Sequence, residues 1–178
     1  ASLHPQVDVS LLYRNMAVNY HSLYGNAFTE GTTPNNEKGW FTGLALRPAR
    51  AFRIDAYADI FRFPWVRFRV NRPSGGSDYL VQITWRPNKQ LEAYSRFRSE
   101  TKAINYSNTN MPLYQTEDVT RTNWRTQIQY RISSSITLRT RAELVWYDKG
   151  QPQAAQGFLA FADILSAPLM QPLSFNAR

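Results

Sequence analysis

Apolar and polar residues alternate with a period of two along the stretch SITLRTRAELVWY, from Ser135 to Tyr147. The even positions are mostly apolar, whereas Arg139, Arg141 and Glu143 occupy odd positions. Side chains on a β-strand alternate between its two faces, so the pattern predicts a strand with one apolar face and one charged face. Such a charged face meets either bulk water or the interior of a barrel whose outer surface meets lipid.

The same alternation recurs along the rest of the chain, in segments separated by turn residues. It predicts an all-β, antiparallel up-and-down meander of about eight to nine strands. A chain of 178 residues requires no more than one domain, so we expect a single domain over residues 1–178. The predicted strands are Val7–Arg14, Trp40–Arg47, Phe52–Phe61, Tyr79–Arg86, Leu91–Ser99, Trp124–Ile132, Ser135–Tyr147 and Gly157–Leu165, with a ninth beginning at Pro172.

The connections between these segments alternate between long and short. In an antiparallel meander, all long connections then lie at one end of the sheet and all tight turns at the other. Bacterial outer-membrane barrels have this asymmetry, and strands of about nine to eleven residues match the tilted length that crosses a bilayer. Within the second long connection, the pair Gly75-Gly76 after Pro73-Ser74 predicts a turn.

Aromatic residues recur near the ends of the predicted strands, as in the two interfacial belts of a membrane barrel. We therefore expect an outer-membrane β-barrel or a large part of one. A soluble all-β domain with these rings in its core is the alternative. The aromatic residues concerned are Trp40, Phe61, Trp65, Trp85, Trp124, Trp146 and Tyr147.

The charge of the chain is strongly basic, with 21 Lys and Arg against 13 Asp and Glu, a net charge of +8. Most of these cations are Arg, which forms planar pairs with carboxylates and stacks on aromatic rings, so it suits a crowded interior better than Lys. The charges are spread along the strands, which favours a lined interior over a nucleic-acid surface. The absence of Cys excludes disulfides and thiolate zinc sites.

Five strings are distributed along nearly the whole chain: NMAVNYHSLYGNAF (15–28), DAYADIFRFPWVRFRV (55–70), RTRAELVWYDKG (139–150), QGFLAFADI (156–164) and LSFNAR (173–178). They resemble the C-terminal barrel region of Bacteroidetes envelope proteins of the helix-hairpin-helix domain family. The resemblance implies an outer-membrane location and a portion of a larger barrel, because the family pattern continues into further strands. The helix-hairpin-helix modules themselves are missing from this sequence, so we do not expect nucleic acid as a partner of this portion.

Two sets of residues are candidate binding sites. The first set lies on polar strand faces and predicts either an anion-preferring pore or a salt-bridge network that fills a narrow barrel. It comprises Arg96, Arg98, Arg125, Arg131, Arg139, Arg141, Glu92 and Glu143.

The second set mixes basic and aromatic residues in a long connection, a combination that holds single-stranded nucleic acid or anionic glycans. A connection that faces lipopolysaccharide, or one that folds inward to close the barrel, is the favoured interpretation. The set comprises Arg62, Trp65, Arg67, Phe68, Arg69 and Arg72.

No set of residues predicts catalysis, a metal site or a cofactor. His4 and His21 lack a second ligand at metal spacing, and Ser133 to Ser135 have no nearby His. Asp55 and Asp59 lie about 13 Å apart on one strand face, too far to share a proton, so we expect them to neutralise Arg53 and neighbouring arginines.

We therefore expect a non-enzymatic outer-membrane barrel that acts as a channel, a transport or binding protein, or a component of an envelope assembly. Outer-membrane lipid or lipopolysaccharide and other envelope proteins are the expected partners. The alternative is a soluble all-β module that binds nucleic acid or glycan through an Arg and aromatic face. The many long inward side chains, and the strand pattern that reaches Arg178, predict a wider barrel whose remaining strands lie outside these residues.

Overall fold

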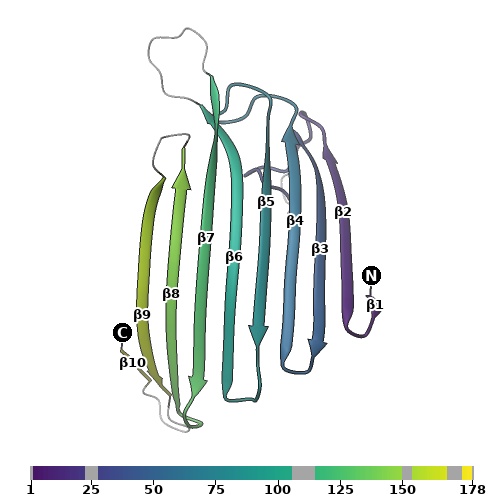
Figure 1. The fold of residues 1–178 in the computed structure, drawn as a ribbon. Helices are drawn as coiled ribbons and strands as arrows, with labels where there is room; N and C mark the ends of the chain where they lie inside the picture. Colours follow the sequence, from purple (N-terminus) through teal and green to yellow (C-terminus); the bar gives the residue numbers. More distant parts are fainter. Residues whose placement is uncertain (1, 23–27, 106–114, 150–153, 168–173, 178) are drawn as a thin grey trace.

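The computed structural model describes residues 2–22, 28–105, 115–149, 154–167 and 174–177. Within these residues, ten strands form one antiparallel sheet in sequence order, with no helix (Figure 1). The predicted up-and-down meander is therefore confirmed. The strands are β1 (Ser2–His4), β2 (Val7–Met16), β3 (Glu37–Ala49), β4 (Phe52–Phe63), β5 (Ser74–Trp85), β6 (Leu91–Asn105), β7 (Thr116–Arg131), β8 (Ile136–Asp148), β9 (Ala155–Ser166) and β10 (Phe175–Ala177).

The long strands extend further than the alternation predicted, up to 15 residues in β6 and 16 in β7. The turn predicted at Gly75-Gly76 is wrong, because both residues lie within β5 and pair with β4. A Cβ atom on Gly76 would lie 2.6 Å from the Phe61 ring, so this glycine makes room for a neighbouring side chain. The short strand β1 was not predicted, whereas β10 lies within the predicted ninth strand, of which residues 172, 173 and 178 lie outside the described residues.

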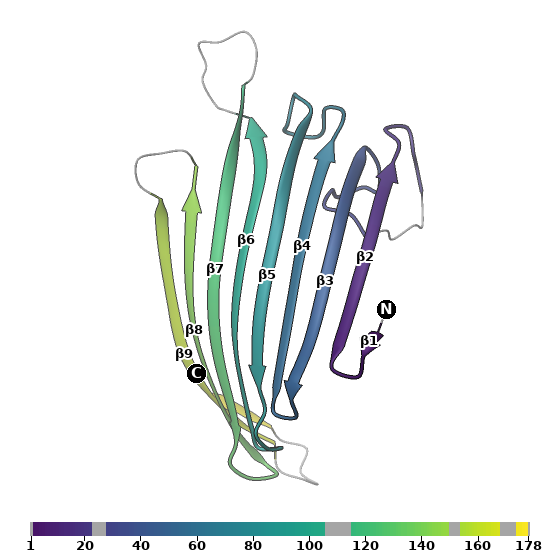
Figure 2. The same cartoon turned by 45° about the vertical axis from the view of Figure 1, so that its right-hand side comes forward.

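The three longest connections, 17–36, 64–73 and 106–115, all join strands at the same end of the sheet, as predicted (Figure 1). Strands β2, β4, β6 and β8 point toward this loop end, and the opposite turn end carries the short connections 50–51, 86–90 and 132–135. The strands form a single curved layer (Figure 2). The concave face is the side that carries Asp55 and Arg125, and the convex face is the side that carries Phe52 and Trp124.

The pairing register separates the two faces row by row. One row of paired residues on the convex face is apolar across all eight long strands, whereas the adjacent row on the concave face carries most of the charge. The convex row is Val9, Leu44, Ala56, Val81, Phe97, Trp124, Leu144 and Phe158. The concave row is Asp8, Ala45, Asp55, Gln82, Arg96, Arg125, Glu143 and Leu159.

Burial is inverted relative to a water-soluble domain. Leu11 on the convex face is 68% exposed and Phe158 is 70% exposed. On the concave face, Glu37 is 0% exposed and Asp59 is 1% exposed. Apolar side chains normally fill the interior of a soluble protein, and charged ones are almost never fully buried unless paired. The concave face therefore buries charged side chains beside a few apolar ones such as Phe61 and Phe63, whereas the convex face exposes large apolar side chains.

Aromatic pairs flank the apolar face. Tyr13 and Trp40 contact each other near the loop end with ring centroids 4.7 Å apart, and Phe52 and Trp85 stack near the turn end at 6.3 Å. The predicted belts are wrong for Phe61, which is 1% exposed on the concave face. Tyr147 also lies on the concave face, and Trp65 lies in a connection. Trp124 lies in the middle of the convex face, away from its ends. Trp146, like Trp40 and Trp85, lies on the convex face near a strand end.

The sheet is open in the part of the chain that the structure describes. Strand β2 pairs with β3 along its length and with β1 over two residue pairs, and no described strand joins β1 or β2 to β9 or β10. The outer edges of β2 and β9 therefore present backbone groups that the described sheet leaves without ladder partners.

Candidate functional site

A buried cluster of charges occupies the loop end of the concave face. Arg14 on β2 donates through Nε to the Glu37 carboxylate on β3. Through Nη1 it also donates to both carboxylate oxygens of Asp59 on β4, and both of these distances are 2.9 Å. The exposed fractions of Arg14, Glu37 and Asp59 are 6%, 0% and 1%. Gly39 leaves the space that the guanidinium fills, since a Cβ there would lie 2.7 Å from Arg14 Cζ. The cluster links three adjacent strands.

The first long connection folds back over this cluster. The Glu37 carboxylate accepts hydrogen bonds from the backbone N–H groups of Glu30, at 2.9 Å, and Gly31, at 3.1 Å. The Glu30 carboxylate in turn pairs with Lys102 Nζ on β6 at 2.9 Å. Residues 28–36 therefore reach across the concave face from β3 to β6 (Figures 1 and 2). The connection that folds inward over the concave face is therefore the first one, and we call residues 28–36 the inward-folded segment.

The second long connection, 64–73, is held to the first by Asn36, which is 6% exposed. The Asn36 side chain accepts a hydrogen bond from Trp65 N at 2.8 Å and donates to the carbonyl oxygens of Trp65, at 2.9 Å, and Val66, at 3.2 Å. Arg67 and Val70 then close a small hairpin through two backbone hydrogen bonds.

The predicted set of basic and aromatic residues in this connection contains one half-buried residue, Arg67, and several exposed residues. Arg67 is half-buried, lies 4.1 Å over the Phe63 ring and donates to Ala103 O at 3.1 Å, and burial lowers the pKa of its guanidinium. Phe68, in contrast, is 86% exposed at the tip of the hairpin. Arg67 therefore anchors the connection, and the exposed members of the set are Trp65, Phe68, Arg69, Arg72 and Arg62, the last on the convex side of β4.

The predicted set on the polar strand faces lies together on the concave face of β6, β7 and β8. Several of its members are paired. Arg98 Nη2 lies 2.7 Å from Asp78, Arg125 Nε lies 2.8 Å from Glu143, and Arg86 Nη2 lies 2.8 Å from Glu92. Arg141 donates to Gln127 Oε1 at 2.7 and 3.0 Å, and Arg131 is exposed near the turn end.

Two predicted arginines are not satisfied in this way. Among the described residues, Arg96 and Arg139 make no ion pair, and the Nε atom of each is buried without a hydrogen-bond partner. Buried polar groups are nearly always hydrogen-bonded, so these two Nε atoms differ from those of the paired arginines of the set.

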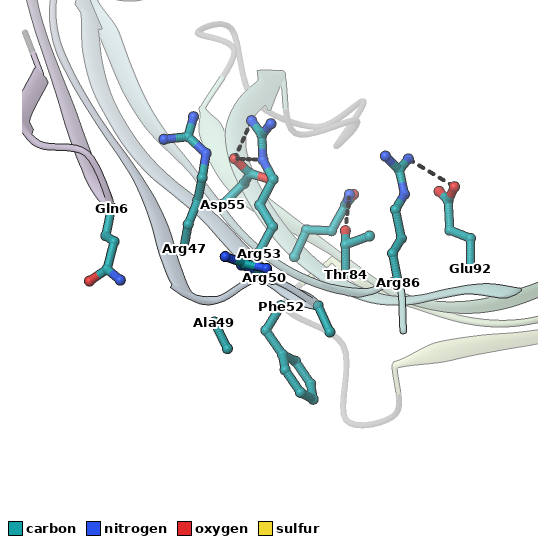
Figure 3. Close-up of a pocket in the computed structure, with 12 residues that line it drawn as sticks. Gln6, Arg47, Ala49, Arg50, Phe52, Arg53, Asp55, Thr84, Arg86 and Glu92 are labelled. Carbon is teal, nitrogen blue, oxygen red and sulfur yellow. Dashed lines mark hydrogen bonds and ion pairs between the residues drawn. The ribbon is translucent and has the colours of Figure 1, made fainter. Parts of the chain in front are cut away.

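A hollow of about 620 Å³ opens at the turn end of the concave face (Figure 3). Arg53 and Asp55 pair beside it at 2.8 Å, as predicted, whereas Asp59 pairs with Arg14 across the intervening strand β3. Arg47 also lines the hollow and pairs with Asp8 at 2.7 Å. Figure 3 shows Arg53, Asp55, Arg86 and Glu92 on one side of the sheet and Phe52 on the other.

Several concave residues were missed by the sequence analysis: Arg14, Glu37, Asp78, Lys102, Arg121, Arg47 and Arg86. Glu37, Asp78 and Lys102 lay beyond the ends of the predicted strands, although each continues the alternation of its strand. Arg14 stood at a polar position of the first predicted strand, so its alternation with Asp8 and Ser10 was a usable signal.

No group of three or more His, Asp or Glu residues that could hold a metal ion occurs in the described ranges. These ranges also contain no helix that is long and apolar enough to span a membrane. Comparisons of the chain with family models, curated proteins and solved structures found no match.

Proposed function

We propose that this chain forms part of an outer-membrane β-barrel, with the convex face in lipid and the concave face lining the interior. The observation that supports this proposal is the inverted burial: Phe158 is 70% exposed, whereas Glu37 and Asp59 are buried. A large contiguous apolar surface marks a site that meets a membrane or another protein. Membrane barrels combine such an outer band with a polar interior.

The height of the apolar face suits a bilayer. On β4, Ile60 pairs with Trp40 of the upper aromatic pair, and Phe52 belongs to the lower pair. These two positions are separated by about 27 Å along the strand at the usual strand rise. With the tilt of about 40° typical of membrane barrels, this length gives a band slightly above 20 Å, close to the expected height of about 25 Å.

The open edges of the sheet support a wider barrel. Lipid supplies no hydrogen bonds to the backbone, so spanning strands occur only in closed barrels. In the proposed assembly, further strands pair with the outer edges of β2 and β9, from the same polypeptide or from another envelope protein.

The exposed part of the second connection suits an anionic membrane surface. Trp65 is 59% exposed and Phe68 is 86% exposed, and Arg69 lies 5.1 Å over the Phe68 ring. Rings with both apolar and polar contacts favour the interface, and Arg pairs with phosphate in a fork geometry. In the proposed orientation, the loop end faces outward and this hairpin contacts lipopolysaccharide.

Membrane fractionation of the intact protein in its host tests the proposal. We expect it in the outer-membrane pellet after a high-salt wash, with extraction only by detergent. Recovery in the aqueous fraction would contradict the proposal and would favour the soluble module that binds an anionic polymer. The soluble module also predicts binding to nucleic acid or glycan that weakens steeply as salt rises.

A further inference from the structure

We propose that the concave face carries a binding site for a phosphate group between β6 and β7. A cavity of about 180 Å³ lies there, smaller than the roughly 300 to 1,000 Å³ of pockets for drug-sized ligands. Its charged lining consists of four arginines and two glutamates. These residues are Arg96, Arg98, Arg121, Arg125, Glu100 and Glu143.

The carboxylates near the cavity are already engaged by other cations. Glu143 pairs with Arg125 at 2.8 Å and also accepts a hydrogen bond from Asn123. Glu100 lies 2.5 Å from Lys102 Nζ, and its distance to Arg98 is 3.9 Å. In the described structure, neither glutamate lies within ion-pair distance of the other two arginines of the cavity.

Arg96 and Arg121 carry the uncompensated charge. Among the described residues, neither makes an ion pair, and the Nε atom of half-buried Arg96 is buried without a partner. When Asp78, Lys102 and Glu30, which belong to the adjoining ion pairs, are counted with the cavity residues, one positive charge remains in excess. A phosphate group carries at least one negative charge, so it can balance this excess.

Guanidinium chemistry selects the ligand class. The planar fork of Arg donates two parallel N–H groups and matches the oxygens of phosphate, whereas a halide accepts at a single point. The ligand is a phosphate group, either free inorganic phosphate or the terminal group of a small phosphate ester. This inference goes beyond the proposed function, because it depends on the concave face alone and not on the medium at the convex face.

Titration calorimetry of the intact protein in detergent, at constant ionic strength, tests the site with inorganic phosphate and with glycerol 3-phosphate. We expect saturable binding of at least one probe, and tighter binding of the ester than of inorganic phosphate would identify an ester as the ligand. Loss of one charged hydrogen bond corresponds to about a tenfold weaker affinity, so Arg96→Gln and Arg121→Gln should each show at least this effect. Arg96→Lys, which keeps the charge, should lose less than Arg96→Gln.

Lys89→Gln is the matched control, because it removes one positive charge from the turn 86–90, outside the cavity. Its affinity should equal that of the unaltered protein. The proposal is overturned if the unaltered protein binds neither probe, or if Lys89→Gln weakens binding as much as Arg121→Gln. Should Arg96→Gln fail to fold, the exposed Arg121 carries the test, and unchanged binding by Arg121→Gln overturns the site.

Discussion

Arg14 on β2 and Asp59 on β4 form an ion pair across the intervening strand β3, with Nη1 2.9 Å from both carboxylate oxygens. The pair passes over Gly39, the β3 residue that is paired in register with Arg14. A side chain at position 39 would occupy the path of the guanidinium, because a Cβ atom there lies 2.7 Å from Cζ. The glycine therefore permits a buried contact between strands that are not neighbours.

Gly39→Ala should destabilise the fold for this reason. Overpacking at a fixed buried site costs about 1 to 3 kcal/mol, and here it also displaces a guanidinium that two carboxylates hold. Gly157→Ala is the matched control, because nothing lies within 4 Å of a Cβ atom built at Gly157 on β9. Urea unfolding in detergent measures both variants. Equal stability of the two would contradict the described packing around Gly39.

Glu37→Gln should also destabilise the protein. The fully buried carboxylate accepts hydrogen bonds from Arg14 and from the backbone N–H groups of Glu30 and Gly31, and a neutral amide loses the charge that strengthens them. We expect a cost of about 1 to 3 kcal/mol, together with faster hydrogen exchange at Glu30 and Gly31. Exchange at these two amides that is as slow as in the unaltered protein would argue against Glu37 as the anchor of the inward-folded segment.

Asn36→Gly should release the hairpin of the second connection. Asn36 has φ 54°, which glycine adopts without strain, so the substitution removes the side-chain bonds to Trp65 and Val66 while it preserves the backbone. We expect faster hydrogen exchange at Trp65, whose N–H is bonded to Asn36. The control is Asn35→Ala, since Asn35 is the neighbouring asparagine and its side chain accepts a hydrogen bond from Thr33 instead of holding the second connection. An identical response from both variants would contradict this role of Asn36.

Leu144→Arg tests the medium at the convex face. Leu144 lies in the apolar row between Trp124 and Phe158, and an arginine near the bilayer midplane costs about 2 to 4 kcal/mol. Arg139→Gln on the concave face should be tolerated with little loss of folding, because glutamine keeps a polar side chain on a face that carries polar residues. Heat-modifiable mobility in detergent and folding into lipid vesicles report the outcome. Equal tolerance of both substitutions would mean that the convex face does not meet lipid.

The alternation of residue types was enough to predict the eight long strands, their antiparallel order and the two-faced character of each strand. These properties are local, because side chains alternate along any strand and short turns join antiparallel neighbours. The pairing of Arg53 with Asp55 could also be predicted, since the two residues stand two positions apart on one face. The residues at which strands begin and end were less predictable, because β6 and β7 extend beyond their predicted bounds.

Only the tertiary structure decided which charges meet. Arg14 and Asp59 are 45 residues apart, and their contact depends on the register of two strand pairings and on the bare backbone at Gly39. The same holds for Glu30 and Lys102, which meet because residues 28–36 fold across the concave face. Register is set by the summed pairing and packing of whole strands, so the pattern of any single strand cannot specify these contacts. The alternation along its strand predicted that Arg96 lies on the charged face. Its lack of a carboxylate partner depends on strand register, because the pairing of β6 with β7 places Arg125 opposite Arg96.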